Sequence, residues 1–555
     1  MTRTDTDPWY CDLAYDSYEE ACEKFEWDLP DDYNLAHDLL RKHPDPDRPA
    51  LFQAYPDGRR ETYTFRDLDR LSNRVANALD ARGIERGDRV GVVVPQKPEN
   101  VLMHLACWKI GAISLPLSVL FGPEALGHRL RDSDARAVVA DASVRETVEE
   151  VEDDSALEHT VVVDDSEDDD SFESLLDEGS EEYAIAETDA ETPAIIMYTS
   201  GSTGPPKGVL HSHGVWVGHC PAFSMYFELD PEGTYWTPAD WAWIGALGDL
   251  VFPAWHYGQA VVGYPMGTFD SREAYSIMEE FDVTGAFLPP TAIRMMMDVD
   301  SSRYDLSIEA ICSGGEPLTP EILAWADDEL GGVPVNELYG QTEANLLVTN
   351  CREWFPARAG SMGKPVPGHD VRVIDPETSE ELPVGEVGEI AVRRAGDPVV
   401  FREYWNRPEK TESATVGASE AQSTSKANGD AVSWHLTGDL GSADEEGYLW
   451  FKSRDDDLII TSGYRVGPRE VEEVLLDHEA VAQVGVVGVP DETRGEIVKA
   501  FVQPVDEGSE ALREELQDLV RERLAKYEYP REIEFRDELP QTTTGKIRRK
   551  DLAEE

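Results

Sequence analysis

The residues from Tyr198 to Gly208 have the composition of a loop that binds phosphate. The apolar run 194–197, which is typical of a buried strand, leads directly into them. The loop offers backbone N–H groups at its glycines, several hydroxyl donors and one compact positive charge. These groups belong to Thr199, Ser200, Gly201, Ser202, Thr203, Gly204 and Lys207. The pattern therefore predicts a polyphosphate site directly after a strand.

The obvious alternative is a Walker-type P-loop, but the sequence departs from that motif at one position. That motif needs Ser or Thr directly after the lysine, so that a hydroxyl can hold magnesium. Lys207 is followed by Gly208 instead. A flexible Ser/Gly turn at the surface is the other interpretation, although such linkers seldom follow an apolar strand directly.

Two later segments repeat the pattern of a strand that ends in glycine and polar residues, namely 310–318 and 335–343. Ligands of open α/β sheets bind where strands end, so three such ends predict one common site. In the second segment the ring of Tyr339 offers a stacking face for a base. The carboxylate of Glu343 could lie beside a polyphosphate only with a cation between them.

Strands and helices alternate in the first third of the chain. The apolar runs 89–94 and 137–140 are typical of buried strands, and the apolar residues of 64–79 have helical spacing. This alternation predicts an α/β fold with a parallel sheet. We expect the acid-rich stretch 148–187 to be a solvated, weakly ordered edge, and the stretch 411–429 to be an inserted disordered loop.

Length and charge restrict the function further. A chain of 555 residues is too long for one core, so at least two domains are expected. The 112 acidic residues against 49 basic ones give a net charge of −63 that is spread along the whole chain. Such a surface repels nucleic acid and anionic membranes, and it indicates a protein adapted to molar salt. With no long apolar run and no signal peptide, we expect a cytoplasmic protein without membrane insertion.

Metal-binding patterns are absent from the sequence. The six cysteines are scattered, with no C-x-x-C pair, which predicts free thiols in a reducing cytoplasm. His211, His213 and His219 have no acidic or cysteine partner at ligand spacing, so we expect packing roles for them.

Together these motifs resemble those of the AMP-forming acyl-CoA synthetase superfamily. Six motifs occur in that superfamily's order, from about Tyr33 to the end of the chain. The resemblance implies an α/β fold with a large N-terminal AMP- and acyl-binding domain, 1–455. It also implies a small mobile α+β domain, 456–555, that turns about a hinge at Asp456 and carries a catalytic lysine, Lys546.

The resemblance assigns a role to each motif. ATP would contact the phosphate loop, including Thr199 and Lys207, and Gly315, Glu316, Pro317, Glu337, Leu338, Tyr339, Gly340, Gln341, Thr342, Asp439, Arg454 and Lys546. Within this set, Tyr339 would stack on the adenine, Asp439 and Arg454 would bind the ribose, and Thr199 and Glu343 would meet Mg²⁺ through ATP. Thr199, Lys207, Glu343 and Lys546 are the expected catalytic residues. CoA would contact Ser462, Gly463, Tyr464, Arg465, Arg494, Tyr529, Pro530 and Arg531.

The implied reaction joins a carboxylic acid to CoA through an acyl-AMP intermediate, and the C-terminal region looks most like the medium-chain acyl-CoA synthetases. The segment 239–248 is either a plain buried helix or the acyl pocket, where Trp241, Trp243 and Gly340 would contact the substrate. A short- or medium-chain fatty acid is the expected substrate. Acetyl- or propionyl-CoA synthesis, adenylation for a carrier protein, and non-catalytic nucleotide binding are the alternatives. The oligomeric state stays open.

The dispersed charge generates the first testable prediction. At molar salt the Debye length falls to about 3 Å, which screens the repulsion among surface carboxylates. The melting temperature and the activity should therefore rise between ~0.1 and ~3 M KCl or NaCl. A melting temperature that stays flat or falls over that range would contradict adaptation to salt.

Overall fold

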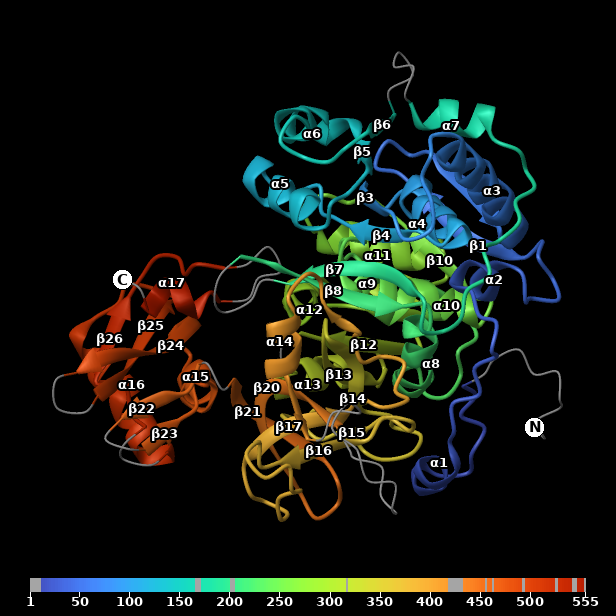
Figure 1. Ribbon diagram of the computed structural model, residues 1–555. Coiled ribbons are helices and arrows are strands. Elements are labelled where there is room, and N and C mark those ends of the chain that lie inside the picture. Colours follow the sequence, from blue (N-terminus) through green and yellow to red (C-terminus); the bar gives the residue numbers. More distant parts are fainter. Residues whose placement is uncertain are drawn as a thin grey trace. The chain divides into compact units, whose positions relative to one another are not determined.

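The computed structural model describes residues 11–164, 171–199, 205–315, 318–417, 433–454, 457–461, 464–491, 495–524, 528–541 and 547–553 (Figure 1). The chain divides into two compact units. The first comprises Met1–Val371 and Val392–His435, and the second comprises Arg372–Ala391 and Leu436–Glu555. The domain boundary that we expect between residues 455 and 456 is placed at a hinge. The division into compact units does not test where a hinge lies, so this boundary stays a prediction.

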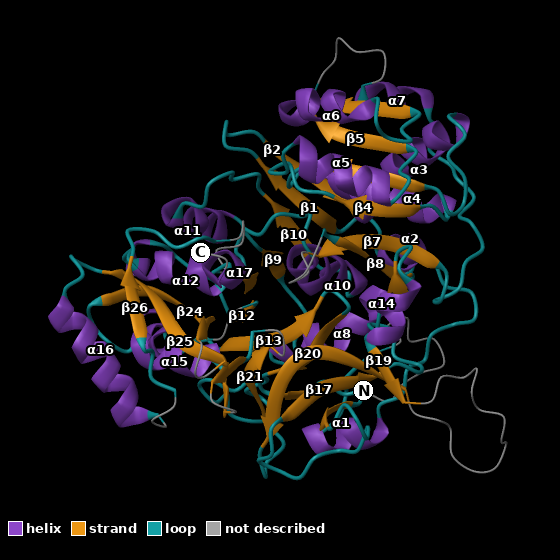
Figure 2. Cartoon of the chain, turned by 60° about the vertical axis from the view of Figure 1, so that its left-hand side comes forward, coloured by secondary structure: helices purple, strands orange, loops and turns teal. Residues whose placement is uncertain are grey.

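Within the described residues, the first unit is built on two large sheets, shown as strands in Figure 2. The nine-stranded sheet has the order β15 (Lys364–Pro365), β14 (Ala344–Thr349), β13 (Val335–Gln341), β12 (Ala310–Gly314), β11 (Gly285–Phe287), β9 (Thr234–Trp236), β10 (Ala260–Gly263), β1 (Pro49–Ala54) and β2 (Arg60–Thr64). The seven-stranded sheet has the order β18 (Glu403–Tyr404), β8 (Lys207–Ser212), β7 (Pro193–Thr199), β4 (Ile113–Pro116), β3 (Arg89–Val93), β5 (Ala137–Asp141) and β6 (His159–Val163).

Helices cover both sheets of the first unit. They are α1 (Tyr18–Lys24), α2 (Leu35–Leu40), α3 (Phe65–Ala81), α4 (Pro98–Ile110), α5 (Pro123–Asp132), η1 (Ala142–Val144), α6 (Arg145–Glu152), α7 (Phe172–Glu178), α8 (Val215–Tyr226), α9 (Ile244–Ala246), the π-helical turn η2 (Leu247–Val251), α10 (Phe252–His256), α11 (Ser271–Glu280), α12 (Pro290–Met297), η3 (Ser301–Arg303), α13 (Pro320–Glu329) and α14 (Pro408–Ser413). The short strand β19 (Thr415–Gly417) pairs with the start of β20.

The α/β fold predicted from the alternating pattern is confirmed. Thr64 is the N-cap of helix α3. Its side chain accepts a hydrogen bond from the backbone N–H of Asp67, and the Asp67 carboxylate accepts one from the backbone N–H of Thr64. Strands β3, β4, β5 and β6 pair in parallel, and β3 and β5 are buried through nearly their whole length. Burial on both faces explains why these strands are continuous apolar runs rather than alternating ones.

The second unit carries two smaller sheets. The first contains β16 (Val371–Ile374), β17 (Gly388–Arg393), β20 (Ser433–Ala443) and β21 (Leu449–Arg454). The second contains β22 (Ile459–Thr461), β23 (Tyr464–Val466), β24 (Val481–Asp491), β25 (Gly495–Pro504) and β26 (Glu532–Phe535). Helices α15 (Pro468–Leu476), α16 (Glu510–Arg523) and α17 (Arg549–Ala553) complete the unit. Its apolar core includes Val471, Val486, Ala500 and Val520.

Two expectations about disorder are wrong within the described residues. In the acid-rich stretch 148–187, β6 adds a strand to the seven-stranded sheet, and α7 packs on α3. Val161, Val162 and Val163 are buried there, which outweighs the acidic composition around them. In the stretch 411–429, the end of α14 and β19 are regular, while 418–432 lie outside the described residues. Among the described helices, none combines the length and the apolar character needed to cross a membrane.

Candidate active site

The phosphate loop predicted from the sequence joins two antiparallel strands. Strand β7 extends to Thr199, β8 begins at Lys207, and these two residues are paired in register. The intervening residues 200–204 lie outside the described residues. Both Thr199 and Lys207 are partly exposed, whereas the strands behind them are buried. The hairpin therefore places the hydroxyl and the ammonium group opposite each other at the neck of the loop.

Tyr404 joins Lys207 to Glu343. The Lys207 ammonium lies 4.4 Å from the centre of the Tyr404 ring, which is a cation–π distance. The Tyr404 hydroxyl donates a hydrogen bond of 2.7 Å to Glu343 Oε1. Strand β18 holds Tyr404 in this place by pairing with β8, with Tyr404 opposite Val209. Two predicted catalytic residues that are 136 positions apart in the sequence are thus brought to one aromatic ring.

The turn that carries Glu343 is held from both sides. Strands β13 and β14 form a hairpin with Gln341 opposite Ala344, so Thr342 and Glu343 are its two turn residues. The imidazole of His211 donates through Nε2 to the carbonyl oxygen of Thr342 at 2.7 Å. Burial lowers the pKa of His211 to about 4, so the ring is neutral at pH 7 and needs no counter-ion. His211 is therefore a packed histidine that positions the turn through Thr342, as expected.

The side chain of Glu337 binds the backbone just beyond the end of the neighbouring strand, β12. Its Oε2 accepts a hydrogen bond of 3.1 Å from the backbone N–H of Leu318. Leu318 follows Glu316 and Pro317, which lie outside the described residues. Strand β12 runs parallel to β13, and Gly314 is in register with Leu338. Gly315 has a φ of +88°, a conformation that favours glycine, directly beyond that pair.

The segment expected to contact adenine has an accessible face. Tyr339, Gly340, Gln341 and Thr342 are partly exposed, whereas the preceding part of β13 is buried. The strand also has an irregular register between Tyr339 and Gln341, at Gly340. Because the ladder breaks at this point, the side chains beside Gly340 can take positions that a regular strand does not allow.

Gly340 is packed against the backbone of β14. A Cβ atom at this position would lie 2.5 Å from the Leu346 nitrogen and 2.7 Å from Asn345 Oδ1. The amide of Asn345 donates to the Asp249 carboxyl group, which lies on the π-helical turn η2. Burial raises the pKa of Asp249 to about 8, so this acid is largely protonated at pH 7. The surroundings of Gly340 therefore include a buried, neutral polar pair.

The two tryptophans proposed for the acyl pocket lie in different environments. Trp241 is fully buried, and a Cβ atom at Gly263 would lie 3.1 Å from its ring. Trp243 is partly exposed and meets Phe121 edge to face, with ring centres 6.1 Å apart. Residues 239–248 form a turn, the short helix α9 and the start of η2 rather than one regular helix. An accessible wall is provided by 243–245, and the acyl-binding role of both tryptophans stays a prediction.

In the second unit, Asp439 and Arg454 lie directly opposite each other on β20 and β21. Arg454 Nε lies 3.4 Å from Asp439 Oδ1, and the arginine side chain is 51% exposed while that of Asp439 is 11% exposed. Gly438, with a φ of +73°, donates its backbone N–H to Glu389 at 2.7 Å. The pair expected to bind ribose therefore lies on one sheet, and the hydrogen bond to Glu389 holds the backbone directly before Asp439.

The two ends of the loop expected to carry the catalytic lysine are also paired with each other. Gln541 and Ile547 form an antiparallel bridge, and residues 542–546, which include Lys546, lie outside the described residues. Helix α17 follows, and its first residue, Arg549, donates to Glu472 at 2.9 Å through Nε and to Asp457 at 3.1 Å. Asp457 directly follows the hinge candidate Asp456, which is itself outside the described residues. Arg549 thus connects the base of the lysine loop to the hinge segment.

The residues predicted to bind CoA are described only in part. Ser462, Gly463 and Arg494 lie outside the described residues, and for Tyr464 and Arg465 the structure describes only their place in β23. Arg531 donates to the Tyr529 hydroxyl at 3.0 Å, and the carbonyl of Pro530 accepts from Gln517. Arg531 lines an open groove of about 490 Å³ together with Lys499, Arg513 and Phe535.

Sequence reasoning missed three residues of these sites: Tyr404, Asp249 and Arg549. Tyr404 belongs to no local motif, since its role comes from the pairing of β18 with β8. Asp249 lies in an apolar run, and a lone acid in such a run is the signal that could have identified it. Arg549 stands among other basic residues near the end of the chain, where nothing distinguishes it.

The chain matches two families of known proteins. Residues 40–405 match the AMP-binding enzyme family, and residues 470–546 match the AMP-binding enzyme C-terminal domain. The chain is 36% identical to the mitochondrial acyl-coenzyme A synthetase ACSM4 of Mus musculus, over 98% of this chain and 94% of the relative. It is 35% identical to acetyl-coenzyme A synthetase of Bacillus subtilis, over 97% and 94%.

Solved structures resemble the chain along most of its length. The anthranilate CoA ligase AuaEII, solved with anthranoyl-AMP, superposes with a TM-score of 0.81 at 29% identity, over 94% of this chain and 97% of that one. The acyl-CoA synthetase of Brucella canis superposes with a TM-score of 0.73 at 32% identity, over 97% and 99%.

The contact between Tyr404 and Glu343 generates the second prediction. Tyr404→Phe keeps the ring beside Lys207 but removes the donor to Glu343, and a hydrogen bond to a charged group contributes about 1.5–3 kcal/mol. We expect pyrophosphate release from ATP in the presence of an acid substrate to fall about tenfold to a hundredfold. Tyr404→Leu, which also removes the ring from Lys207, should lose more.

Tyr275→Phe is the matched control for this experiment. Tyr275 is buried in the same unit, and its hydroxyl donates to the carbonyl of Met296 at 3.3 Å. This variant should lose stability without a comparable loss of activity. Equal losses of activity in Tyr404→Phe and Tyr275→Phe would mean that Tyr404 only supports the fold.

Proposed function

Because the chain belongs to the AMP-binding enzyme family and is an AMP-forming acyl-CoA synthetase, we propose that it activates a short- or medium-chain fatty acid in two half-reactions. In the first, the acid and ATP give acyl-AMP and pyrophosphate. In the second, the thiol of CoA displaces AMP and gives acyl-CoA. The observation that carries this assignment of roles is the connected set of Lys207, Tyr404 and Glu343 at the neck of the phosphate loop.

Magnesium fits the groups at this neck. Thr199 offers a hydroxyl oxygen and Glu343 a carboxylate, and Mg²⁺ prefers oxygen donors while keeping several waters and substrate phosphates. A carboxylate has about four acceptor positions, and the Tyr404 hydroxyl uses one on Oε1. Thr199 and Glu343 would hold the ion through ATP, where it would neutralise phosphate charge. The remaining steps belong to the protein's own side chains.

In the first half-reaction, the fatty acid carboxylate must approach the α-phosphate although both are anionic. No side chain of the enzyme is needed as a nucleophile, so its contribution is positioning and charge neutralisation. Lys207 and Lys546 supply positive charge, and a charge that meets the transition state more strongly than the ground state accelerates the step. The cation–π contact with Tyr404 keeps the Lys207 ammonium near the loop neck.

Nucleotide binding would use the second unit as well. Asp439 offers two acceptor oxygens for the ribose hydroxyls, and Arg454 is the exposed partner beside it. The second half-reaction needs groups that recognise CoA, which carries phosphates and an adenine ring. The groove offers three basic side chains, Arg531, Lys499 and Arg513, and the ring of Phe535, which would suit these groups. Glu532 and Glu534 also line it, and Glu534 pairs with Lys499 at 2.9 Å, so phosphate would have to compete with that ion pair.

The relatives differ in acyl chain length, since one is named as an acetyl-coenzyme A synthetase and another as a member of the ACSM group. Our preference for longer acids rests on Gly340. Acetate-specific members of the resembled family carry Trp at this position, which closes the pocket behind a two-carbon acid. Gly340 has no indole that could close the pocket in this way. Because β14 fills the space directly at Gly340, a longer chain would have to lie along the partly exposed, apolar wall at 243–245.

The third prediction is therefore an acyl chain-length profile. Acetate should be a poor substrate, and kcat/KM should rise several-fold per carbon until the pocket is filled, since each buried CH₂ contributes about 0.8 kcal/mol. CoA-dependent AMP formation with straight-chain acids is the measurement. A sharp maximum at acetate would contradict it and would mean that another side chain, such as Trp241 or Trp243, fills the space. Acyl transfer to a carrier protein but not to CoA would favour the carrier-protein alternative.

The fourth prediction concerns Lys546 and the alternation of the two half-reactions. Lys546 belongs to a loop of the second unit, so it can be delivered for adenylation and then withdrawn about the hinge at Asp456. Lys546→Ala should reduce acyl-AMP formation about a hundredfold to a thousandfold, as expected for loss of one charge-stabilising donor. Given pre-made acyl-AMP, the same variant should form the thioester at close to the normal rate.

Lys550→Ala is the charge-matched control, since Lys550 is exposed on α17, four residues beyond Lys546. It should leave both half-reactions close to normal. Rapid-quench measurement of each half separates the possibilities. Equal losses in both halves for Lys546→Ala would mean that this lysine supports the fold or nucleotide binding in general, and domain alternation would be abandoned.

A further inference from the structure

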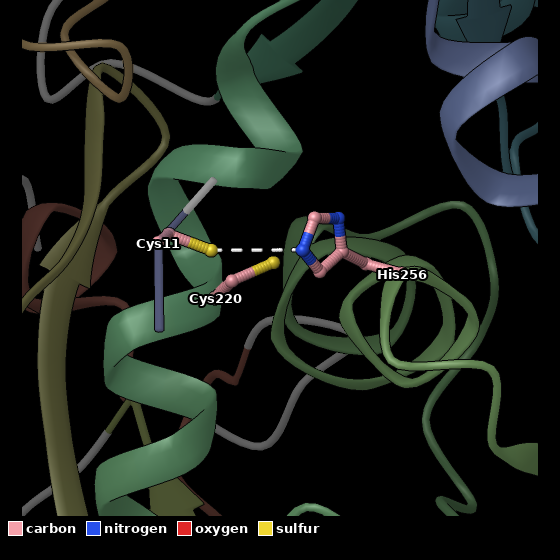
Figure 3. A group of neighbouring side chains, drawn as sticks. All are labelled: Cys11, Cys220 and His256. Carbon is pink, nitrogen blue, oxygen red and sulfur yellow. Dashed lines mark hydrogen bonds between the residues drawn. The ribbon is translucent and has the colours of Figure 1, made fainter. Parts of the chain in front are cut away.

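Three side chains from distant parts of the sequence meet in the core of the first unit (Figure 3). Cys220 lies on α8, His256 ends α10, and Cys11 belongs to the segment before α1. All three are fully buried. Both sulfur atoms face the same edge of the His256 ring (Figure 3).

One separation in this cluster equals that of a tetrahedral zinc site, and the other two are close enough to reach it with small side-chain shifts. Cys11 Sγ lies 3.6 Å from His256 Nε2, and the ligand atoms of all three residues lie within 4.8 Å of one another. In tetrahedral zinc sites the Zn–S distance is about 2.3 Å and the Zn–N distance about 2.0–2.1 Å. These bond lengths place sulfur and nitrogen about 3.6 Å apart, and two sulfurs about 3.8 Å apart.

The other side of the His256 ring is oriented as in a metal-binding histidine. His256 Nδ1 lies 2.8 Å from Asp38 Oδ2, and the ring can donate to this carboxylate. Lys42 Nζ also approaches this ring, at 2.7 Å from Nδ1 and 3.3 Å from Nε2, so its ammonium group must turn away from Nε2, toward Asp38, before that nitrogen can bind a metal ion. Lys42 donates to the other oxygen of Asp38 at 2.7 Å, and the side chains of both residues are almost fully buried. A carboxylate behind a ligating histidine is the usual outer partner in zinc sites.

The charges of the cluster balance when a divalent cation is added. Two thiolates and the Asp38 carboxylate give three negative charges, while the cation and the Lys42 ammonium give three positive ones. A neutral total matters here, because an unbalanced charge in a buried site is costly. Without the ion the cluster balances in another way. Against the effect of burial, Asp38 raises the pKa of His256 to about 9, and the neighbouring Cys220 and His256 lower the pKa of Cys11 to about 6. A protonated imidazole then faces a thiolate, so the fold does not require the ion.

We propose that Cys11, Cys220 and His256 bind one zinc ion, which ties the segment at Cys11 to α8 and α10. On binding, two protons leave the cluster, one from the Cys220 thiol and one from His256 Nε2, while the Nδ1–H of His256 still donates to Asp38 and Cys11 binds as a thiolate. The fourth position is taken by water or by Tyr257, whose hydroxyl lies 3.9 Å from Cys11 Sγ. Two thiolates and one imidazole favour zinc over the hard cations magnesium and calcium.

Zinc binding by the purified full-length chain tests the proposal. The protein is stripped with a chelator, kept reduced, and titrated with Zn²⁺, and bound metal is counted by elemental analysis. Co²⁺ serves as a spectroscopic probe, since thiolate ligation gives a charge-transfer band that oxygen ligation lacks. We expect one equivalent of zinc, a thiolate-to-cobalt band, and a melting temperature that rises with zinc and falls again with chelator.

Variants connect that binding to this cluster. Cys220→Ser and His256→Gln should each abolish the stoichiometric site. Cys107→Ser is the matched control, since Cys107 is equally buried but lies on α4 outside the cluster. Asp38→Asn keeps all three ligands and should weaken zinc about tenfold to a hundredfold by releasing the imidazole orientation. Circular dichroism and pyrophosphate release establish that each variant is folded.

Three results would overturn the proposal. The first is a reduced, folded protein that binds no zinc. The second is one equivalent of zinc that Cys220→Ser and His256→Gln retain as fully as Cys107→Ser does, which would place the metal elsewhere. The third is a disulfide between Cys11 and Cys220, seen as a mass lower by two hydrogens, in a protein that still binds no zinc after reduction.

Discussion

The central constraint of the first unit is to hold a cation, Lys207, and a carboxylate, Glu343, in fixed positions close to each other, where we propose that phosphate binds. The Tyr404 ring meets this constraint because it contacts both partners, the Lys207 ammonium over its face and Glu343 through its hydroxyl. Each partner stands at the end of a hairpin, β7–β8 or β13–β14, and β18 places the tyrosine against β8. Preorganised charges of this kind act on a transition state without reorganising when it forms.

Lys207 and Lys546, the two lysines that we propose for catalysis, lie at the end of a loop or within one, and the two ends of each loop are paired with each other. At the first neck Thr199 pairs with Lys207, and at the second Gln541 pairs with Ile547. Closing the ends of a loop removes much of the conformational freedom that a reactive side chain would otherwise lose on binding substrate. The second neck is fixed further by Arg549, which bonds Glu472 and Asp457. A motion about the hinge segment would therefore carry the base of the lysine loop with it.

The sequence shows a candidate segment most clearly where its residues are neighbours in the chain. The phosphate loop, the β13 segment and the Asp439 motif are short runs of this kind, and the resemblance to the synthetase superfamily supplies their expected roles. Tyr404 could not be found in this way, because it acts through a strand pairing that its neighbours do not encode. The Cys11, Cys220 and His256 cluster is the extreme case. Its members are separated by 209 and 36 positions, so every spacing rule for zinc ligands fails although the atoms converge.

The packing around Gly340 couples this position to its neighbours, so the acyl specificity that we propose would not depend on one residue alone. A Cβ atom there would meet the backbone nitrogen of Leu346 at 2.5 Å, so no larger side chain fits unless β14 moves. Any such movement would shift Asn345, whose amide bonds Asp249 on the π-helical turn. That turn continues directly from the partly exposed wall at 243–245. Gly340, the Asn345–Asp249 pair and the π-helical turn are therefore coupled through packing, so a change at one of them is expected to shift the others. If the acyl chain binds at this wall, as we propose, its length would depend on all of them together.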